Sequence, residues 1–101
     1  MKANILLVDD EEALCRAAEK ILTKEGYRVT TAPTAQQGLE QFKSTEFNLL
    51  ITDLMLPDFD GVTLLKRVKE LRPPVEVIII TGRGTIEKAV SEVKEALKGN
   101  D

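Results

Sequence analysis

The sequence predicts an α/β fold in which a parallel β-sheet is covered by helices on both faces. Short runs of aliphatic residues alternate four times with segments of helical periodicity, and glycine, proline or acidic residues stand between them. Right-handed crossovers restrict this alternation to a doubly wound sheet, for which we expect the strand order 2-1-3-4. A chain of 101 residues is enough for one domain, which we assign to residues 1–101.

The first strand and helix are predicted between residues 4 and 25. Asn4–Val8 is a short apolar run, which is typical of a strand that is buried on both faces. Gly26 ends the helix that follows, and we expect Cys15 within that helix to be a buried, inert thiol. The apolar residues that recur at helical spacing are Leu14, Ala18, Ile21 and Leu22.

The second strand and helix follow directly. Residues 27–31 are rich in β-branched side chains and predict a strand. Thr34 and Gln37 have the spacing of a capping box, so we expect Thr34 to cap a helix. Leu39 and Phe42 lie on the face of this helix that should pack against the sheet.

The third unit runs from residue 47 to the proline pair at 73–74. Residues 47–52 predict a strand that ends at Asp53, and Asp60 is the expected cap of the next helix. The two prolines end that helix. Its apolar residues are Leu64, Leu65, Val68 and Leu71.

The fourth unit repeats the same order. Residues 75–80 predict an aliphatic strand, and a glycine-containing loop at 81–84 follows it. Thr85 is the expected N-cap of a fourth helix. The apolar face of this helix is formed by Ile86, Ala89, Val90, Val93 and Leu97.

Composition disfavours several classes of function. The net charge is −3 and no basic stripe is present, so we expect no nucleic-acid partner. No apolar stretch is long enough for a signal peptide or a spanning helix, so we expect no membrane partner. A single cysteine cannot form an internal disulfide, which fits a cytoplasmic protein. Histidine is absent, so any mechanism must work without imidazole.

Polar side chains follow three of the predicted strands. Asp9 and Asp10 come after the first strand, Asp53 ends the third, and Thr81 follows the fourth. Because the carboxyl ends of parallel strands meet at one edge of the sheet, we expect these residues to converge. Neighbouring carboxylates repel one another unless a proton or a cation is present, and their hard oxygens suit Mg²⁺. A carboxylate beside such an ion is a potential nucleophile toward a phosphoryl group, and the product would be an acyl phosphate.

Each of these residues also has a purely structural interpretation. Residues 9–12 could be an acidic helix start, where carboxylates interact favourably with the helix dipole. Asp53 could open a turn, and Thr81 could bond only to backbone. Asp58 and Asp60 are interpreted as turn and cap residues. The coincidence of polar side chains at three strand ends favours the functional interpretation.

Three segments resemble the response-regulator receiver domain family, whose members are also called CheY-like, and the likeness runs from about residue 4 to residue 90. Residues 5–11 (ILLVDDE) resemble its first strand and acidic pair, and residues 48–61 (NLLITDLMLPDFDG) resemble its phosphorylation-site segment. Residues 77–82 (VIIITG) resemble its fourth strand and switch hydroxyl. The resemblance implies a flavodoxin-like sheet and a phospho-accepting role in two-component signalling.

The resemblance also implies a role for each site residue. Asp53 would be the phosphoacceptor. Asp10, Asp53 and the backbone carbonyl of Met55 would bind Mg²⁺, and Asp9 would help to position the ion. Thr81 would hydrogen-bond the phosphoryl group and act as the switch hydroxyl. The partner would be a sensor histidine kinase, and the chain itself would be no enzyme beyond Mg²⁺-assisted self-phosphorylation and dephosphorylation.

The sequence departs from this family after the fourth strand. The family has a fifth strand that ends in a Lys-Pro pair, whereas here every lysine after Thr81 lies in a helical pattern and no proline follows. Those lysines are Lys88, Lys94 and Lys98. Residues 91–101 form an atypical helical end, as in a truncated, rearranged or engineered receiver.

A missing fifth strand would leave the fourth strand as an exposed apolar edge, unless rearrangement or a partner chain supplies the strand. We therefore expect a homo-oligomer, such as a dimer, formed through this edge or by exchange of an element.

Two other functions compete with the phospho-accepting one. A receiver-fold scaffold or self-association module without working phosphotransfer would account for the missing lysine. A phosphate-binding enzyme would use the loop at residues 81–85 (TGRGT) at a helix N-terminus. That loop lacks the lysine of a P-loop, and a Gly-x-Gly pattern alone is a weak signal. The complete acidic set favours the receiver.

Overall fold

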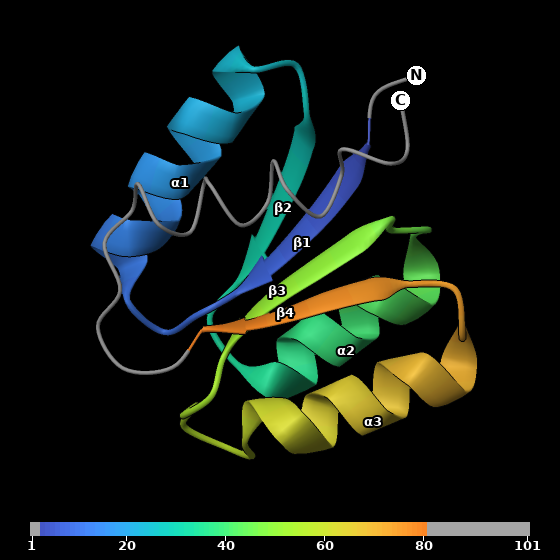
Figure 1. Cartoon of the computed structure of the whole chain (residues 1–101). Helices are drawn as coiled ribbons and strands as arrows, with labels where there is room; N and C mark the ends of the chain where they lie inside the picture. Colours follow the sequence, from blue (N-terminus) through green and yellow to red (C-terminus); the bar gives the residue numbers. More distant parts are fainter. Residues whose placement is uncertain (1–2, 81–101) are drawn as a thin grey trace.

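The computed structural model describes residues 3–80, which form four parallel strands and three helices (Figure 1). The strand order is β2-β1-β3-β4, and each neighbouring pair is parallel. The predicted α/β fold and the order 2-1-3-4 are therefore confirmed. The predicted fourth helix and residues 91–101 lie outside the described residues. The elements are β1 (Asn4–Val8), α1 (Glu12–Lys24), β2 (Arg28–Ala32), α2 (Ala35–Ser44), β3 (Leu49–Asp53), α3 (Gly61–Leu71) and β4 (Glu76–Ile80).

Three of the strands begin later than the sequence predicts, β2 and β4 by one residue and β3 by two. The amide of Tyr27 donates to the carbonyl of Leu22 at 3.1 Å, so this residue completes the end of α1 instead of starting β2. Gly26 makes that turn with a φ of 99°, a conformation that favours glycine. Phe47 was predicted to start the third strand, but its ring stacks on Phe42 with the centroids 6.3 Å apart, and β3 begins after it.

Different helices cover the two faces of the sheet. Figure 1 shows α1 on one face and α2 and α3 together on the other. Because side chains alternate along a strand, β1 sends Ile5 and Leu7 to one cluster and Leu6 and Val8 to the other. The helices complete these clusters with Cys15, Ala18 and Leu22 from α1, Leu39 and Phe42 from α2, and Leu64 and Val68 from α3.

Helices α2 and α3 begin at the residues that the sequence predicts. The hydroxyl of Thr34 accepts from the amide of Gln37 at 3.1 Å, and the carboxylate of Asp60 accepts from the amide of Thr63 at 2.7 Å. The hydrogen bonds from Thr63 hold the pKa of Asp60 below its ordinary value. Caps of this kind contribute about 1 kcal/mol each. Helix α1, in contrast, begins at Glu12, and the residue before it, Glu11, makes no side-chain cap.

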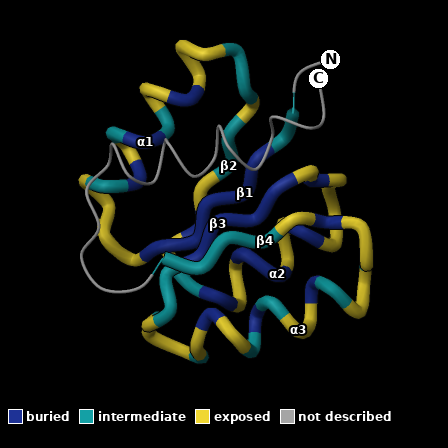
Figure 2. Tube along the Cα trace, viewed as in Figure 1, coloured by how far each residue is buried: buried dark blue, intermediate teal, exposed yellow. Residues whose placement is uncertain are grey.

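Burial is uneven across the sheet. Figure 2 shows β1 and β3 buried in the centre, whereas the aliphatic residues of β4 are only half-buried. Two helix residues with the predicted apolar spacing lie at the surface, Ile21 at 38% exposure and Leu71 at 48%. Within residues 3–80, no helix has the length and apolar character needed to cross a membrane.

Candidate functional site

The carboxyl ends of β1 and β3 bring three carboxylates together. Asp9 and Asp10 directly follow β1, and Asp53 is the last residue of β3. The two strands are parallel neighbours with Val8 paired to Thr52, so the residues after them lie side by side. One ligand oxygen from each of the three aspartates lies within 4.8 Å of the others. The predicted convergence of these residues is therefore present in the fold.

Asp9 is the most buried of the three, with 6% exposure. Burial raises the pKa of this carboxyl above its ordinary value, and repulsion from Asp53 and Asp10 raises it further. A hydrogen bond from the amide of Glu11, at 2.9 Å, only partly opposes these effects. The fold therefore holds Asp9 where its negative charge is costly and where a cation would relieve that cost.

Asp53 is half-buried at the tip of β3, and its backbone is closely packed. A Cβ atom added to Gly61 would lie 2.5 Å from the carbonyl oxygen of Asp53, so α3 can begin this close to the strand only with glycine. The amide of Met55 points toward one carboxylate oxygen of Asp53 across 3.4 Å. Met55 itself is 74% exposed.

The loop between β3 and α3 is held at several points. Leu54 donates to the carbonyl of Ile80 at 3.0 Å and accepts from the amide of Gly61 at 2.8 Å. Farther along, both carboxylate oxygens of Asp58 accept from the start of α2, from the amide of Ala35 at 3.0 Å and from that of Gln36 at 2.8 Å. The exposed Met55 is therefore flanked by anchored residues.

The contact between Asp58 and α2 was not predicted from the sequence. Asp58 was interpreted as a turn residue, and its bonding partners lie 22 and 23 positions away. No local pattern signals such a contact, because a cap is ordinarily recognised by its position just before the helix. Only the packing of α2 beside the loop brings these residues together.

The acidic cluster has no cationic partner within the described range. The ion pair found in residues 3–80 joins Arg16 and Glu12, both on the surface of α1. Carboxylate oxygens at this spacing are the donor type that Mg²⁺ prefers. The residues present therefore fit a hard divalent cation.

Cys15 lies beside the same site but is protected. Its thiol is 7% exposed and donates to the carbonyl of Asp9 across 3.4 Å. Burial raises the pKa of this thiol to about 11, and the neighbouring carboxylates of Asp9 and Asp10 add to the effect. The predicted burial of Cys15 is confirmed, and its chemistry is that of a packing residue.

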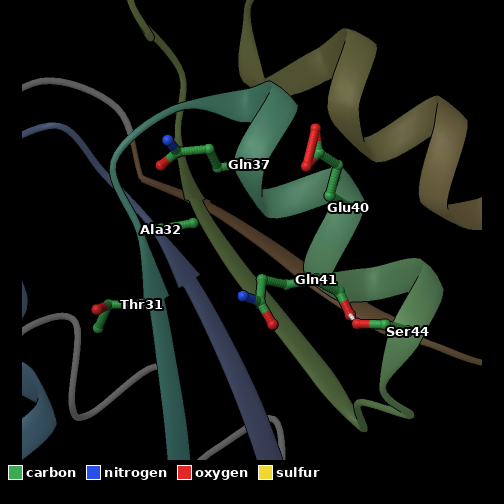
Figure 3. Close-up of a pocket in the computed structure, with 6 residues that line it drawn as sticks. All are labelled: Thr31, Ala32, Gln37, Glu40, Gln41 and Ser44. Atoms are coloured by element: carbon green, nitrogen blue, oxygen red, sulfur yellow. Dashed lines mark hydrogen bonds between the residues drawn. The ribbon is translucent and has the colours of Figure 1, made fainter.

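Thr81 and the loop at residues 81–85 lie outside the described residues. The last described position, Ile80, pairs with Asp53 in the sheet. A shallow pocket of about 250 Å³ lies elsewhere, between the edge strand β2 and helix α2, and polar side chains such as Gln37, Glu40 and Gln41 line it (Figure 3). That pocket includes none of the predicted site residues.

Comparisons with known proteins identify the family of this chain. The family model for the response regulator receiver domain matches residues 5–99, and thus extends beyond Val90. The transcriptional regulatory protein ZraR of Escherichia coli (strain K12) is 35% identical over 91 residues, which are 90% of this chain but only 21% of ZraR.

Solved receiver structures have the same fold. A receiver domain protein (CheY-like) from Methanospirillum hungatei JF-1 is 37% identical, with a TM-score of 0.79 over 93% of this chain and 75% of that one. The beryllofluoride-activated NtrC4 receiver domain dimer is also 37% identical, with a TM-score of 0.75 over 91% of this chain and 76% of that one.

Proposed function

This chain belongs to the response regulator receiver domain family, and we propose that it accepts a phosphoryl group on Asp53 from a sensor histidine kinase, in a reaction that depends on Mg²⁺. The observation that carries the proposal is the cluster of Asp9, Asp10 and Asp53, with ligand oxygens within 4.8 Å. An acidic helix start alone would not require its carboxylates to meet an aspartate at the end of a neighbouring strand.

In the proposed transfer, a carboxylate oxygen of Asp53 attacks the phosphorus atom of a phosphohistidine on the kinase. The new O–P bond forms as the P–N bond breaks, and the released imidazole nitrogen takes up a proton from solvent. The product is an acyl phosphate. Attack of water on phosphorus later returns the carboxylate and inorganic phosphate. This self-dephosphorylation is the limit of the catalysis that we propose for the chain itself.

Mg²⁺ would be held by Asp10, Asp53 and the backbone carbonyl of Met55, with Asp9 helping to position it. When bound, the ion would neutralise negative charge between the nucleophile and the phosphoryl oxygens. The fit rests on three neighbouring carboxylates, of which Asp9 is buried and repelled by the other two, and which have no cationic partner within residues 3–80. Thr81, as the switch hydroxyl, would hydrogen-bond the transferred group.

Self-association is a further part of the proposal. Within residues 3–80, β4 is the last strand of the sheet and its aliphatic residues are half-buried, so it offers an apolar edge. The NtrC4 neighbour is a receiver domain dimer. Sedimentation at micromolar concentration would test this part. A protein that stays monomeric with and without a phosphodonor would contradict it.

The phosphoacceptor assignment is tested by intact-mass measurement after incubation with a small phosphodonor and Mg²⁺. Wild-type protein should gain one phosphoryl group, and Asp53→Asn should gain none. Glu46→Gln is the matched control, because it removes an exposed carboxylate from the opposite end of the sheet, and it should react like wild type. An equal mass gain in Asp53→Asn would refute the assignment.

A scaffold without phosphotransfer is the second candidate, and the absence of a Lys-Pro pair after Thr81 favours it. A folded wild-type protein that binds Mg²⁺ but gains no phosphoryl group would support this candidate. A mass gain that is lost on adding a chelator would support the first.

A further inference from the structure

The start of helix α2 is capped by two side chains, one local and one distant. The first four amides of a helix have no carbonyl partner within the helix itself. Here the hydroxyl of Thr34 accepts from Gln37 at 3.1 Å, and the carbonyl of Thr34 accepts from Gly38 at 3.0 Å. The amides of Ala35 and Gln36 are left, and both are bound by the carboxylate of Asp58.

This arrangement differs from that of the other helices. Helix α3 is capped by the residue directly before it, Asp60, and α1 has no side-chain cap. At α2, one half of the cap comes from the loop that carries Met55. A helix cap needs only a nearby acceptor, and Thr34 already supplies one. The second contact, in which both carboxylate oxygens of Asp58 accept, therefore also fixes the position of Asp58.

We propose that Asp58 is a positioning residue of the phosphorylation site, which holds the β3–α3 loop against α2 and so places the backbone carbonyl of Met55 for the metal ion. The proposal rests on the metal ligands of the proposed function. It goes beyond them, because Asp58 touches neither the ion nor the phosphoryl group and acts through the loop.

The loop geometry supports this role. Toward β3, Leu54 is fixed by hydrogen bonds to Ile80 and Gly61. On the other side, Leu56 and Phe59 pack against the core cluster beneath α2 and α3. Met55 between these points is 74% exposed, so its own side chain contributes little to holding its carbonyl. The two hydrogen bonds that Asp58 accepts from α2 are the polar contact that holds the β3–α3 loop on that side.

The carboxylate of Asp58 stays ionised over the range in which a receiver works. Partial desolvation raises its pKa, but the hydrogen bonds from Gln36 and Ala35 outweigh that effect, and the net pKa lies below the ordinary value. Hydrogen bonds to an ionised acceptor are shorter and stronger than neutral ones, so the anchor is present at neutral pH.

The test compares Asp58→Ala with Thr34→Ala, because both remove a cap from α2 but only the first releases the loop. Mg²⁺ binding to the ¹⁵N-labelled protein is followed through the amide signals of Asp10 and Leu54. We expect Asp58→Ala to weaken Mg²⁺ binding about tenfold, the lower end of effects seen for groups that orient metal ligands. Thr34→Ala should leave Mg²⁺ affinity within about twofold of wild type while lowering the urea concentration at which the protein unfolds.

Two further measurements separate positioning from stability. Asp58→Asn keeps one acceptor oxygen and should give an intermediate Mg²⁺ affinity. The phosphorylation rate of Asp58→Ala with a small phosphodonor should fall at low Mg²⁺ and recover at saturating Mg²⁺, because the nucleophile Asp53 is unchanged. A merely destabilised protein would not show this recovery.

The outcomes are distinct. If wild type and Asp58→Ala bind Mg²⁺ equally, or if Thr34→Ala weakens binding as much as Asp58→Ala, then Asp58 is only a helix cap and the proposal is overturned. If wild type itself binds no Mg²⁺, both this proposal and the proposed metal site fail. A tenfold loss confined to Asp58→Ala, with partial recovery in Asp58→Asn, supports the positioning role.

Discussion

The two ends of the sheet differ in how their polar side chains are arranged. At the amino end, polar groups satisfy one another. Asn4 and Asn48 are linked by two hydrogen bonds, from the amide of Asn4 to the Asn48 side chain at 2.8 Å and from the amide of Asn48 to the Asn4 carbonyl at 2.9 Å. Arg72 donates to the carbonyls of Phe42 and Thr45 where α2 ends. At the carboxyl end, Asp9, Asp10 and Asp53 are brought together without such compensation.

Helix direction explains part of this difference. All three described helices begin at the carboxyl end of the sheet, where their free amides attract acids, and end at the amino end, where their free carbonyls attract cations. Asp58 and Asp60 are accounted for in this way, as is Arg72. The cluster of three aspartates is not, because Asp9 is buried and its pKa is raised above its ordinary value. This negative charge, beyond what the helix starts use, distinguishes the end of the sheet at which we propose the phosphorylation site.

The largest expected effect concerns the pH dependence of stability at the carboxyl end. The pKa of Cys15 is raised from 9.0 to about 11 in the folded protein, so the thiol stabilises the fold fully below pH 9 and loses that contribution as the pH rises to 11. The free energy of unfolding relative to Cys15→Ala should therefore fall by about 3 kcal/mol once the folded thiol is fully ionised, with most of that fall between pH 9 and pH 11, since each unit corresponds to about 1.4 kcal/mol.

Urea denaturation of both proteins at several pH values would measure this difference. The comparison with Cys15→Ala cancels every contribution to stability that the two proteins share. A difference that stays constant from pH 8 to pH 11 would contradict the protected thiol.

The next effect concerns the amino end of the sheet and leaves the three aspartates unchanged. Arg72→Ala removes two hydrogen bonds to backbone carbonyls, at 3.0 and 2.8 Å, and a guanidinium that lies 5.0 Å from the centroid of the Phe42 ring. We expect a loss of about 2 kcal/mol in the free energy of unfolding and no change in Mg²⁺ affinity. Urea denaturation and Mg²⁺ titration would measure the two quantities.

Arg67→Ala is the matched control for Arg72→Ala. Its guanidinium also lies over a ring, 5.1 Å from the centroid of Phe59, but Arg67 is exposed on α3, and its loss should cost less than about 1 kcal/mol. Equal losses for the two arginines would contradict the contribution of the backbone hydrogen bonds of Arg72. Weaker Mg²⁺ binding in Arg72→Ala would show that the two ends of the sheet are not independent.

The smallest effect concerns the repulsion between the carboxylates at the carboxyl end of the sheet. Asp9→Asn should stabilise the metal-free protein at neutral pH by about 1 kcal/mol, the repulsion of two unit charges about 4 Å apart in water. Because the pKa of Asp9 is raised on folding, its destabilising charge is absent below the ordinary value of 3.8, and the advantage of the variant should vanish there.

Thermal denaturation with and without Mg²⁺ would measure this effect. Asp9→Asn should also be stabilised less by added Mg²⁺ than wild type, because one carboxylate near the ion has been removed. Glu46→Gln, at the amino end, should change neither quantity. A less stable metal-free Asp9→Asn protein would indicate that the Asp9 charge is already compensated.

Much of the fold could be predicted because it depends on local patterns. The apolar run of Asn4–Val8 and the caps Thr34 and Asp60 are short-range signals, and each element within residues 3–80 lies close to its predicted position. Strand starts were less predictable. Tyr27 belongs by composition to a strand, but its amide is used by the end of α1, and Phe47 is drawn into the core by Phe42. These are choices between competing partners, which depend on packing.

For residues 3–80, the sequence by itself determined the order and approximate position of the strands and helices, and that acidic residues stand at the ends of the first and third strands, because periodicity and turn chemistry act over a few positions. Only the tertiary structure decided that Asp58 reaches α2, that Gly61 must approach the carbonyl of Asp53, and that Asp9 is buried. These features depend on residues outside the local sequence pattern, because the helical crossovers of the parallel sheet bring separate segments of the chain together at the carboxyl ends of the strands.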